Sequence, residues 1–219
     1  MVDSVAASGP LVGLVAGEPS GDLLGAELVT ALRERHPWAR FVGIGGPKMM
    51  AAGVESLYPM EKLSVRGYVE VIRHYREIIG IRSDLKRYFL REKPSVFIGI
   101  DAPDFNLDLE AALKATGVKT VHFVCPSVWA WRAERVNAIR RSVDHVLCLF
   151  PFEPALLARH GIAATYVGHP LAQVIPLEPD RAAAREKLGL RQDAPVLALL
   201  PGSRQSEIAH LALRFFQAA

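Results

Sequence analysis

The strongest constraint on the fold is the alternation of short apolar runs with longer segments of helical periodicity. The runs are rich in valine, isoleucine, leucine and phenylalanine, and nearly every position in them is apolar. Strands that are buried on both faces of a parallel sheet have this composition. We therefore predict strands over residues 11–16, 41–45, 95–100, 120–124, 145–150, 164–168 and 195–200.

Segments with helical spacing lie between these runs. Apolar residues recur every three or four positions in 22–35 and in 69–92, where Ile72, Tyr75, Ile79 and Leu85 form one stripe. A helix over 105–117 ends in a glycine, and two more are expected over 134–144 and 152–161. This order predicts an α/β fold, a doubly wound parallel sheet of Rossmann-like type.

The pattern changes after residue 170. Residues 171–194 lose strand character and contain two prolines and a charged helix, after which 195–219 resume with a strand, a turn and a helix. We interpret 1–170 as one Rossmann-like domain, 171–194 as a linker, and 195–219 as the first strand-helix unit of a second α/β domain.

Composition excludes several classes of protein. Half of the 219 residues are hydrophobic and 22% are charged, so the chain can bury a core. The two cysteines, Cys125 and Cys148, are too few for a disulfide framework and lie in apolar runs, which predicts buried thiols in a reducing cytoplasm. We find no secretory signal and no apolar run near the ~18 residues needed to cross a bilayer, so we expect a cytoplasmic protein.

The charge is unevenly distributed. The whole chain carries a net +3, whereas residues 66–93 alone contain eight Lys/Arg and four Asp/Glu. The mean hydropathy of +0.17 is also high for a chain without a membrane span. A basic, partly apolar face indicates an anionic partner such as phosphate or a membrane surface. The basic residues cluster in one helix with no nucleic-acid motif beside them, so we expect no nucleic acid as partner.

The loops that follow the predicted strands contain the candidate site residues, because ligands bind beyond the carboxyl ends of parallel strands. After the first strand come Glu18, Ser20 and Gly21, where a helix N-terminus can bind an anion or a hydroxyl. Capping explains Ser20 and Asp22 equally well, whereas an acid at the position of Glu18 has no capping role. This turn is neither a dinucleotide fingerprint nor a P-loop.

A second group of candidates follows the strand at 95–100. Asp101 leaves an apolar strand directly, and burial there would make it a better general base. Asp104 and Asn106 come next, at the start of a helix, where Asp104 is also a candidate cap.

The remaining candidates lie in three later loops. Ser127, Trp129 and Arg132 follow the strand at 120–124 and can line a sugar or acyl site, and His169 ends the strand at 164–168. Ser203 and Arg204 stand at a strand-helix junction suited to a diphosphate. No metal-ligand spacing is present, so we expect no metal ion and no other cofactor.

The motifs together resemble those of lipid-A-disaccharide synthases, glycosyltransferases of the two-domain GT-B class. The similarity runs from about residue 10 to the end through AGEPSGD, GIGGPKM, IGIDAPDFN, PSVWAWR, LFPFEP, YVGHP and LLPGSR. It implies transfer of 2,3-diacylglucosamine from its UDP derivative to 2,3-diacylglucosamine 1-phosphate. The products are a β-1,6-linked disaccharide and UDP, formed without a metal at the cytoplasmic face of the inner membrane of Gram-negative bacteria.

The resemblance also assigns roles. Asp101 is then the base for the acceptor 6-hydroxyl, with Glu18 as runner-up or as an orienting partner, and Arg204 faces the UDP diphosphate. The donor segments of such enzymes would lie beyond residue 219, so the chain alone should be inactive. Two alternatives stay open, another GT-B enzyme acting on a soluble UDP-sugar and a binding domain without chemistry. The oligomeric state is open too.

Overall fold

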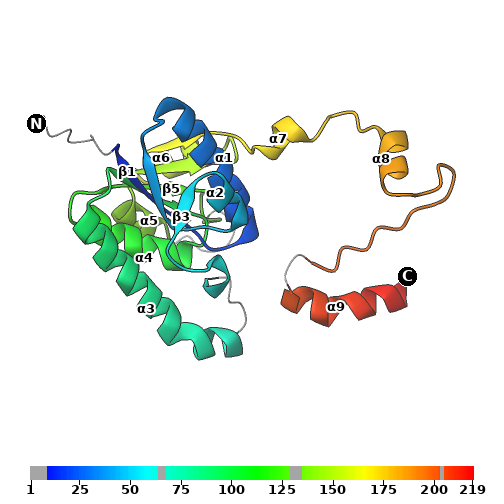
Figure 1. Ribbon diagram of the computed structural model, residues 1–219, viewed down its shortest axis with the longest axis horizontal. Coiled ribbons are helices and arrows are strands. Elements are labelled where there is room, and N and C mark those ends of the chain that lie inside the picture. Colours follow the sequence, from blue (N-terminus) through cyan, green and yellow to red (C-terminus); the bar gives the residue numbers. More distant parts are fainter. Residues whose placement is uncertain (1–8, 64–67, 129–134, 203–204) are drawn as a thin grey trace, which may run out of the picture. The chain divides into compact units, whose positions relative to one another are not determined.

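A seven-stranded parallel sheet forms the centre of the larger of two units in this chain (Figure 1). The computed structural model describes residues 9–63, 68–128, 135–202 and 205–219, with the side chains of 68–74, 205 and 206 left aside. The strands are β1 (Leu11–Ala16), β2 (Arg40–Ile44), β3 (Val54–Ser56), β4 (Val96–Ile100), β5 (Lys119–Phe123), β6 (His145–Cys148) and β7 (Ala164–Tyr166). Their order across the sheet is β3-β2-β1-β4-β5-β6-β7.

Helices connect the strands and cover both faces of the sheet. They are α1 (Pro19–Arg35), α2 (Pro47–Ala51), the 3₁₀ turn η1 (Met60–Lys62), α3 (Tyr68–Glu92), α4 (Pro103–Lys114), α5 (Arg135–Ser142) and α6 (Glu153–Ala158). Proline stands in the first turn of α1, α2, α4 and α6, where its missing N–H leaves no helical hydrogen bond unmade. Figure 1 shows α1 and α2 on one face of the sheet and α3 and α4 on the other.

Alternating residues of the central strands divide the core between these two faces. Leu14 and Ala16 of β1 pack with Leu24 of α1 and Met49 of α2. Val15, between them in the sequence, belongs to the other face, whose cluster includes Ile81, Leu85 and Phe89 of α3 and Leu109 and Leu113 of α4. Strands covered on both sides must be apolar throughout, which is the pattern that the sequence shows.

The structure confirms the α/β class and the parallel, doubly wound sheet. Six predicted strands are present, with ends that differ by a few residues. β3 was not predicted, because only Val54 of its three residues is buried and apolar. The predicted stripe on α3 was wrong at Tyr75, which is 56% exposed, because the inner face of α3 is set by Ile81, Leu85 and Phe89.

The chain divides into two units, Met1–Val174 and Ile175–Ala219. The short helix α7 (Leu171–Val174) ends the first, and the second contains α8 (Arg181–Lys187) and α9 (Gln205–Ala218). Asp180 caps α8 by accepting the N–H of Ala183 at 2.9 Å.

The strand predicted over 195–200 is absent from the structure of those described residues, which are irregular. A strand requires a neighbouring strand for its backbone hydrogen bonds, and the described residues of 175–219 contain none. The helix expected to follow is present as α9. The division of this part into a linker and a second α/β domain stays a prediction.

Candidate active site

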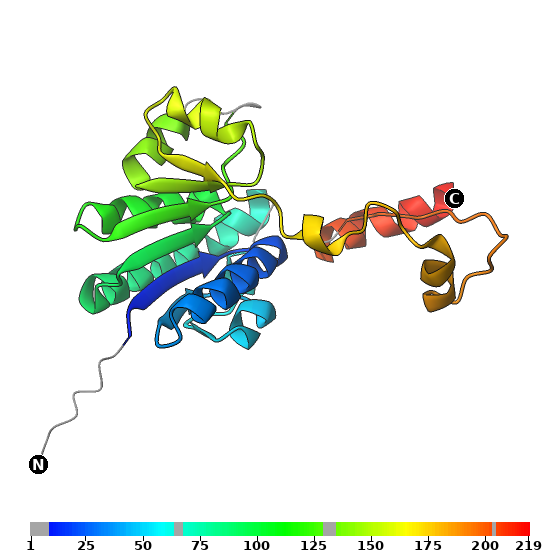
Figure 2. The same cartoon turned by 90° about the horizontal axis from the view of Figure 1, so that it is seen from above.

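The sheet has a topological switch point between β1 and β4. From β1 the chain proceeds outward through β2 and β3, whereas from β4 it proceeds in the opposite direction through β5, β6 and β7. The register aligns Ala16 with Ile100, and Ile100 with Phe123, so the carboxyl ends of β1, β4 and β5 lie side by side, as Figure 2 shows for the strands. Loops that diverge at such a point leave a crevice for a ligand.

Asp101 lies at this point, in a loop with an uncommon backbone. Asp101 and Ala102 have φ angles of 52° and 45°, the left-handed region that non-glycine residues rarely adopt. The N–H of Asp101 donates to the carbonyl of Phe123 at 2.9 Å, and its carbonyl accepts from Nδ2 of Asn106 at 2.8 Å. The half-buried Asp101 is therefore held between β5 and α4, and strained backbone held in this way is typical of functional sites.

Asn106 connects the loop after β4 to the end of β1. Its Nδ2 also donates to the carbonyl of Val15 in β1 at 3.2 Å, which joins the carboxyl ends of β1 and β4. The side chain is fully buried, so it offers no surface to a substrate in this structure. The sequence predicted that Asn106 contacts a ligand directly. In the structure its buried side chain instead supports the loop of Asp101.

A buried histidine and a buried glutamate form a polar layer together with Asn106. Nδ1 of His122 in β5 lies 2.8 Å from Oε1 of Glu110 in α4, and both side chains are fully buried. Nε2 of His122 has no hydrogen-bond partner in the described part of the chain, so Nδ1 makes the single hydrogen bond of the ring there. The layer therefore fixes α4 against β5 below the loop of Asp101.

Glu18 lies on the neighbouring loop, after β1. It is half-buried and takes the N-cap position of α1 with extended backbone angles, φ −146° and ψ 159°. A Cβ added to Gly17 would lie 3.1 Å from Cβ of Ala102, so the loops of Glu18 and Asp101 are in contact. Gly21 is buried at the start of α1 and Ser20 beside it is exposed. The structure thus brings together the loops of the two predicted catalytic carboxylates.

Asp22 has a role that the sequence did not indicate. Its buried carboxylate accepts the N–H groups of Gly46, Lys48 and Met49 at 2.9–3.0 Å, which caps α2 rather than its own helix. A Cβ on Gly46 would lie 2.6 Å from Oδ2 of Asp22, so this close approach requires glycine. The loop after β2 is thereby attached to the start of α1.

The other predicted residues are more scattered. Asp104 is exposed on α4, where it pairs with Arg135, and the N-cap position of α4 is taken by Ala102. Ser127 is exposed on the loop after β5, one strand away from Asp101. His169 follows β7, three strands from β4 or about 14 Å along the sheet, and its Nδ1 accepts the N–H of Leu171 at 3.2 Å. Trp129, Arg132, Ser203 and Arg204 lie outside the described residues.

One cluster was missed by the sequence analysis. Cys125 and Cys148 are both buried, as predicted, but they also meet each other and Glu153 at the carboxyl ends of β5 and β6. Their separation along the chain matches no metal-ligand spacing. The available signal was topological, because Cys125 follows the strand predicted over 120–124 and Cys148 lies in the next predicted strand, 145–150.

Fold and site define an α/β protein with two carboxylates on adjoining loops at the switch point of its sheet. The chain belongs to the lipid-A-disaccharide synthetase family, whose profile matches residues 12–219. It is 69% identical over 209 residues to a lipid-A-disaccharide synthase of Albidiferax ferrireducens, covering 95% of this chain and 54% of that protein. A lipid-A-disaccharide synthase of Verminephrobacter eiseniae is 63% identical with the same coverage. The chain spans about half the length of the curated relatives it matches.

Among solved structures, a UGT transferase from Siraitia grosvenorii in complex with UDP aligns with a TM-score of 0.47 and 11% identity, over 81% of this chain and 54% of that one. This likeness is too distant to support an argument about the chain. None of the helices in the described residues combines the length and the apolar character that crossing a membrane requires.

Proposed function

We propose that this chain forms the acceptor-side part of a lipid A glycosyltransferase. The enzyme transfers 2,3-diacylglucosamine from its UDP derivative to 2,3-diacylglucosamine 1-phosphate and releases UDP. Family membership over residues 12–219 supports the reaction. The observation that carries the assignment to this part of the molecule is the contact between the loops of Glu18 and Asp101 at the switch point.

Asp101 is the proposed general base. In an inverting transfer the acceptor O6 attacks the anomeric carbon, the bond from that carbon to the diphosphate breaks, and the proton of the 6-hydroxyl passes to the base. The backbone of Asp101 is held by β5 on one side and by Asn106 on the other, so its carboxylate is presented from a rigid loop. Preorganisation of this kind lowers the cost of reaching the reactive geometry.

Glu18 is the proposed partner of Asp101, orienting the acceptor sugar through its hydroxyl groups. Its loop adjoins that of Asp101, and the N-terminus of α1 follows it with Ser20 exposed. The partial positive charge of that helix end favours an anion such as the 1-phosphate of the acceptor. Ser127 is a further candidate contact from the loop after β5, and Trp129 and Arg132 stay predicted contacts for sugar or acyl chains.

The leaving diphosphate requires positive charge or N–H donors. Ser203 and Arg204 are the proposed donors, on the evidence of their motif alone. The remainder of the donor site is expected in sequence that the longer relatives have and residues 1–219 do not. We propose that the enzyme binds the cytoplasmic face of the inner membrane as a peripheral protein, since both substrates carry acyl chains.

Replacement of Asp101 tests the proposed base. Residues 1–219 are joined to the remaining sequence of the Albidiferax ferrireducens relative, which the chain matches at 69% identity. We expect Asp101→Asn to lower kcat by roughly 10²–10⁴-fold, the contribution of a general base. Glu18→Gln should act mainly on KM of the acceptor, because an orienting group contributes to binding as well as to chemistry.

The matched control is Asp108→Asn on α4. Asp108 is an exposed carboxylate on α4 that pairs with Arg82 at 2.5 Å and has no proposed part in the transfer, so its loss should leave kcat unchanged. Circular dichroism confirms that each variant is folded. An Asp101→Asn protein that keeps kcat within about tenfold of the parent would rule out the general-base role.

A further inference from the structure

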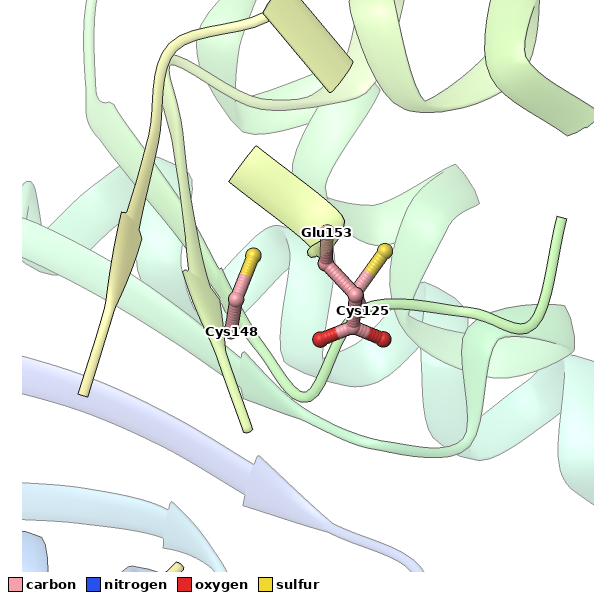
Figure 3. Close-up of side chains that lie close together, drawn as sticks. All are labelled: Cys125, Cys148 and Glu153. Atoms are coloured by element: carbon pink, nitrogen blue, oxygen red, sulfur yellow. The ribbon is translucent and has the colours of Figure 1, made fainter. Parts of the chain in front are cut away.

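The two cysteines and a glutamate form a buried cluster that the proposed glycosyl transfer does not use. Cys125 follows β5, Cys148 ends β6, and Glu153 begins α6 (Figure 3). One ligand atom from each of the three, two sulfurs and a carboxylate oxygen, lies within 4.8 Å of the others. The three residues are 5%, 0% and 2% exposed.

Backbone contacts hold the three residues in place. The N–H of Val124 donates to the carbonyl of Leu147 at 3.0 Å, which joins the ends of β5 and β6 immediately beside the two cysteines. Oε2 of Glu153 accepts the N–H of Phe150 at 3.0 Å, which directs its carboxyl group back toward the end of β6. The cluster is therefore built on neighbouring strands and a helix start, and a rigid support of this kind is typical of binding sites.

The chemistry of the cluster points to a cation. A carboxylate that is almost fully buried costs free energy unless a positive charge or hydrogen bonds compensate it. The N–H of Phe150 compensates one carboxylate oxygen of Glu153. A metal ion would use the carboxylate and both sulfurs together, whereas a disulfide between the two cysteines would use the sulfurs alone. Thiolates select thiophilic ions over Mg²⁺ and Ca²⁺, and a carboxylate in the same set favours Zn²⁺ over Cu⁺.

We propose that Cys125, Cys148 and Glu153 form a binding site for a thiophilic divalent cation of the Zn²⁺ type. In a tetrahedral zinc site the ligand sulfurs are roughly 3.8 Å apart, because each Zn–S bond is about 2.3 Å. The ligand atoms of the cluster all lie within 4.8 Å of one another, which is compatible with this geometry. Three protein ligands leave the fourth position of a tetrahedral ion to water.

Exchange of the two thiol protons for the cation makes binding compatible with the burial of the cluster. When the cation binds, each thiol releases its proton, and the two sulfurs and the carboxylate become its ligands. Two protons leave as one divalent cation enters, so the net charge of the buried cluster does not change.

Titration of the reduced, metal-free chain with Zn²⁺ and Cd²⁺ tests the site. The protein has two cysteines in all, so a thiolate-to-Cd²⁺ charge-transfer band in the ultraviolet reports on this cluster alone. We expect the band to saturate at one Cd²⁺ per chain, and we expect Zn²⁺ to compete for it. Cys148→Ala should abolish the band. Glu153→Gln should weaken affinity by more than about tenfold, the least that loss of even an outer-shell partner costs.

The control is His160→Asn, which removes an exposed imidazole just beyond α6 and should leave Cd²⁺ affinity unchanged. A second measurement needs no variant, because bound Zn²⁺ should slow alkylation of both thiols in the parent chain. Absence of a saturable band and of protection from alkylation in the folded parent would overturn the proposal. Equal Cd²⁺ binding by the parent and by Cys148→Ala would overturn it too.

Discussion

The loop of Asp101 is held in place by residues whose side chains are fully buried. Asn106 donates from one amide to the carbonyls of Asp101 and Val15, and Glu110 lies one helical turn further along α4, bonded to His122. Oδ1 of Asn106 and Oε2 of Glu110 have no hydrogen-bond partner among the described residues. Unsatisfied buried groups destabilise a fold, so their presence here fits a role in holding the loop of Asp101.

Gly99 lets this polar layer approach the sheet. A Cβ at Gly99 would lie 2.2 Å from Oε1 of Glu110 and 2.8 Å from Cβ of Asn106. Because both neighbours are fully buried, they cannot move aside freely. We expect Gly99→Ala to lower the free energy of unfolding by about 1–3 kcal/mol, the usual cost of overpacking, as measured by urea denaturation.

Gly80 provides the matched control for this prediction. It lies within α3, and nothing stands within 4 Å of the Cβ that alanine would add. Gly80→Ala should therefore stabilise the protein by about 0.5–1 kcal/mol, because alanine restricts the unfolded chain and favours the helix. If both substitutions changed stability in the same direction, the crowding at Gly99 would be refuted as the cause.

Residue types indicated the site better than they indicated individual roles. The carboxylates of Glu18 and Asp101 could be chosen because each follows an apolar run. The roles of Asn106 and Asp22 could not, because each depends on loops that are distant in sequence, Val15 for Asn106 and residues 46–49 for Asp22. The cysteine cluster was not predicted for the same reason, since sequence spacing does not show which strands are neighbours.

At the scale of elements, an apolar run forms a strand only where a neighbouring strand can pair with it. The runs of β1 and β4 are buried and paired on both sides. The run at 195–200 has the same apolar character but forms no strand in the described chain, where Leu197 and Leu200 are 69% and 77% exposed. β3 is the converse, a strand of three residues that pairs with β2 and shows no apolar run.

Asp144 connects three elements at the start of β6. Its carboxylate accepts the N–H of Thr120 in β5 at 2.9 Å and lies 3.5 Å from Nζ of Lys114 in α4. Partial burial alone would raise the pKa of Asp144, but the Thr120 N–H and the Lys114 charge outweigh it and hold the pKa below the usual 3.8. The folded state thus favours the ionised carboxylate.

A lowered pKa makes the contribution of Asp144 to stability depend on pH. The contribution is complete above the usual pKa of the aspartate and is lost as the pH falls through the lower pKa of the folded state. Asp144→Asn should therefore reduce the Tm at neutral pH, and the difference from the parent should shrink in acid. Thermal melts of both proteins, from neutral pH down to below the folded-state pKa of Asp144, measure this difference in Tm. A difference that stayed constant with pH would contradict the ionic role.

At the scale of the whole molecule, the uneven charge seen in the sequence is concentrated along α3. The inner face of α3 is apolar, while Arg87 and Arg91 on the outer face have side chains that are 79% and 72% exposed. Both arginines pair with acids on the same helix, and such exposed pairs contribute little free energy and exchange readily for other anions. Tyr75 adds exposed aromatic surface to the same helix.

Binding to anionic vesicles tests whether this helix meets a membrane. We expect the chain to sediment with phosphatidylglycerol vesicles and not with phosphatidylcholine vesicles, and to be released by salt. Each basic residue near such a surface contributes about 1 kcal/mol, so Lys86→Ala/Arg87→Ala should weaken binding roughly 30-fold.

Arg140→Ala/Arg141→Ala on α5 is the control, because it removes the same charge from another exposed helix end. It should weaken binding much less than the α3 double variant. Equal losses from the two would show that net charge, and not the outer face of α3, is responsible.

We propose that residues 1–219 supply the acceptor-side domain of a lipid A glycosyltransferase and need further sequence for turnover. Disaccharide formation from UDP-2,3-diacylglucosamine and 2,3-diacylglucosamine 1-phosphate, followed by mass spectrometry together with UDP release, tests this proposal. We predict turnover by the chain joined to the remainder of the Albidiferax ferrireducens relative, and none by residues 1–219 alone. Disaccharide formation by residues 1–219 alone, or none by the folded joined protein, would overturn this assignment of residues 1–219.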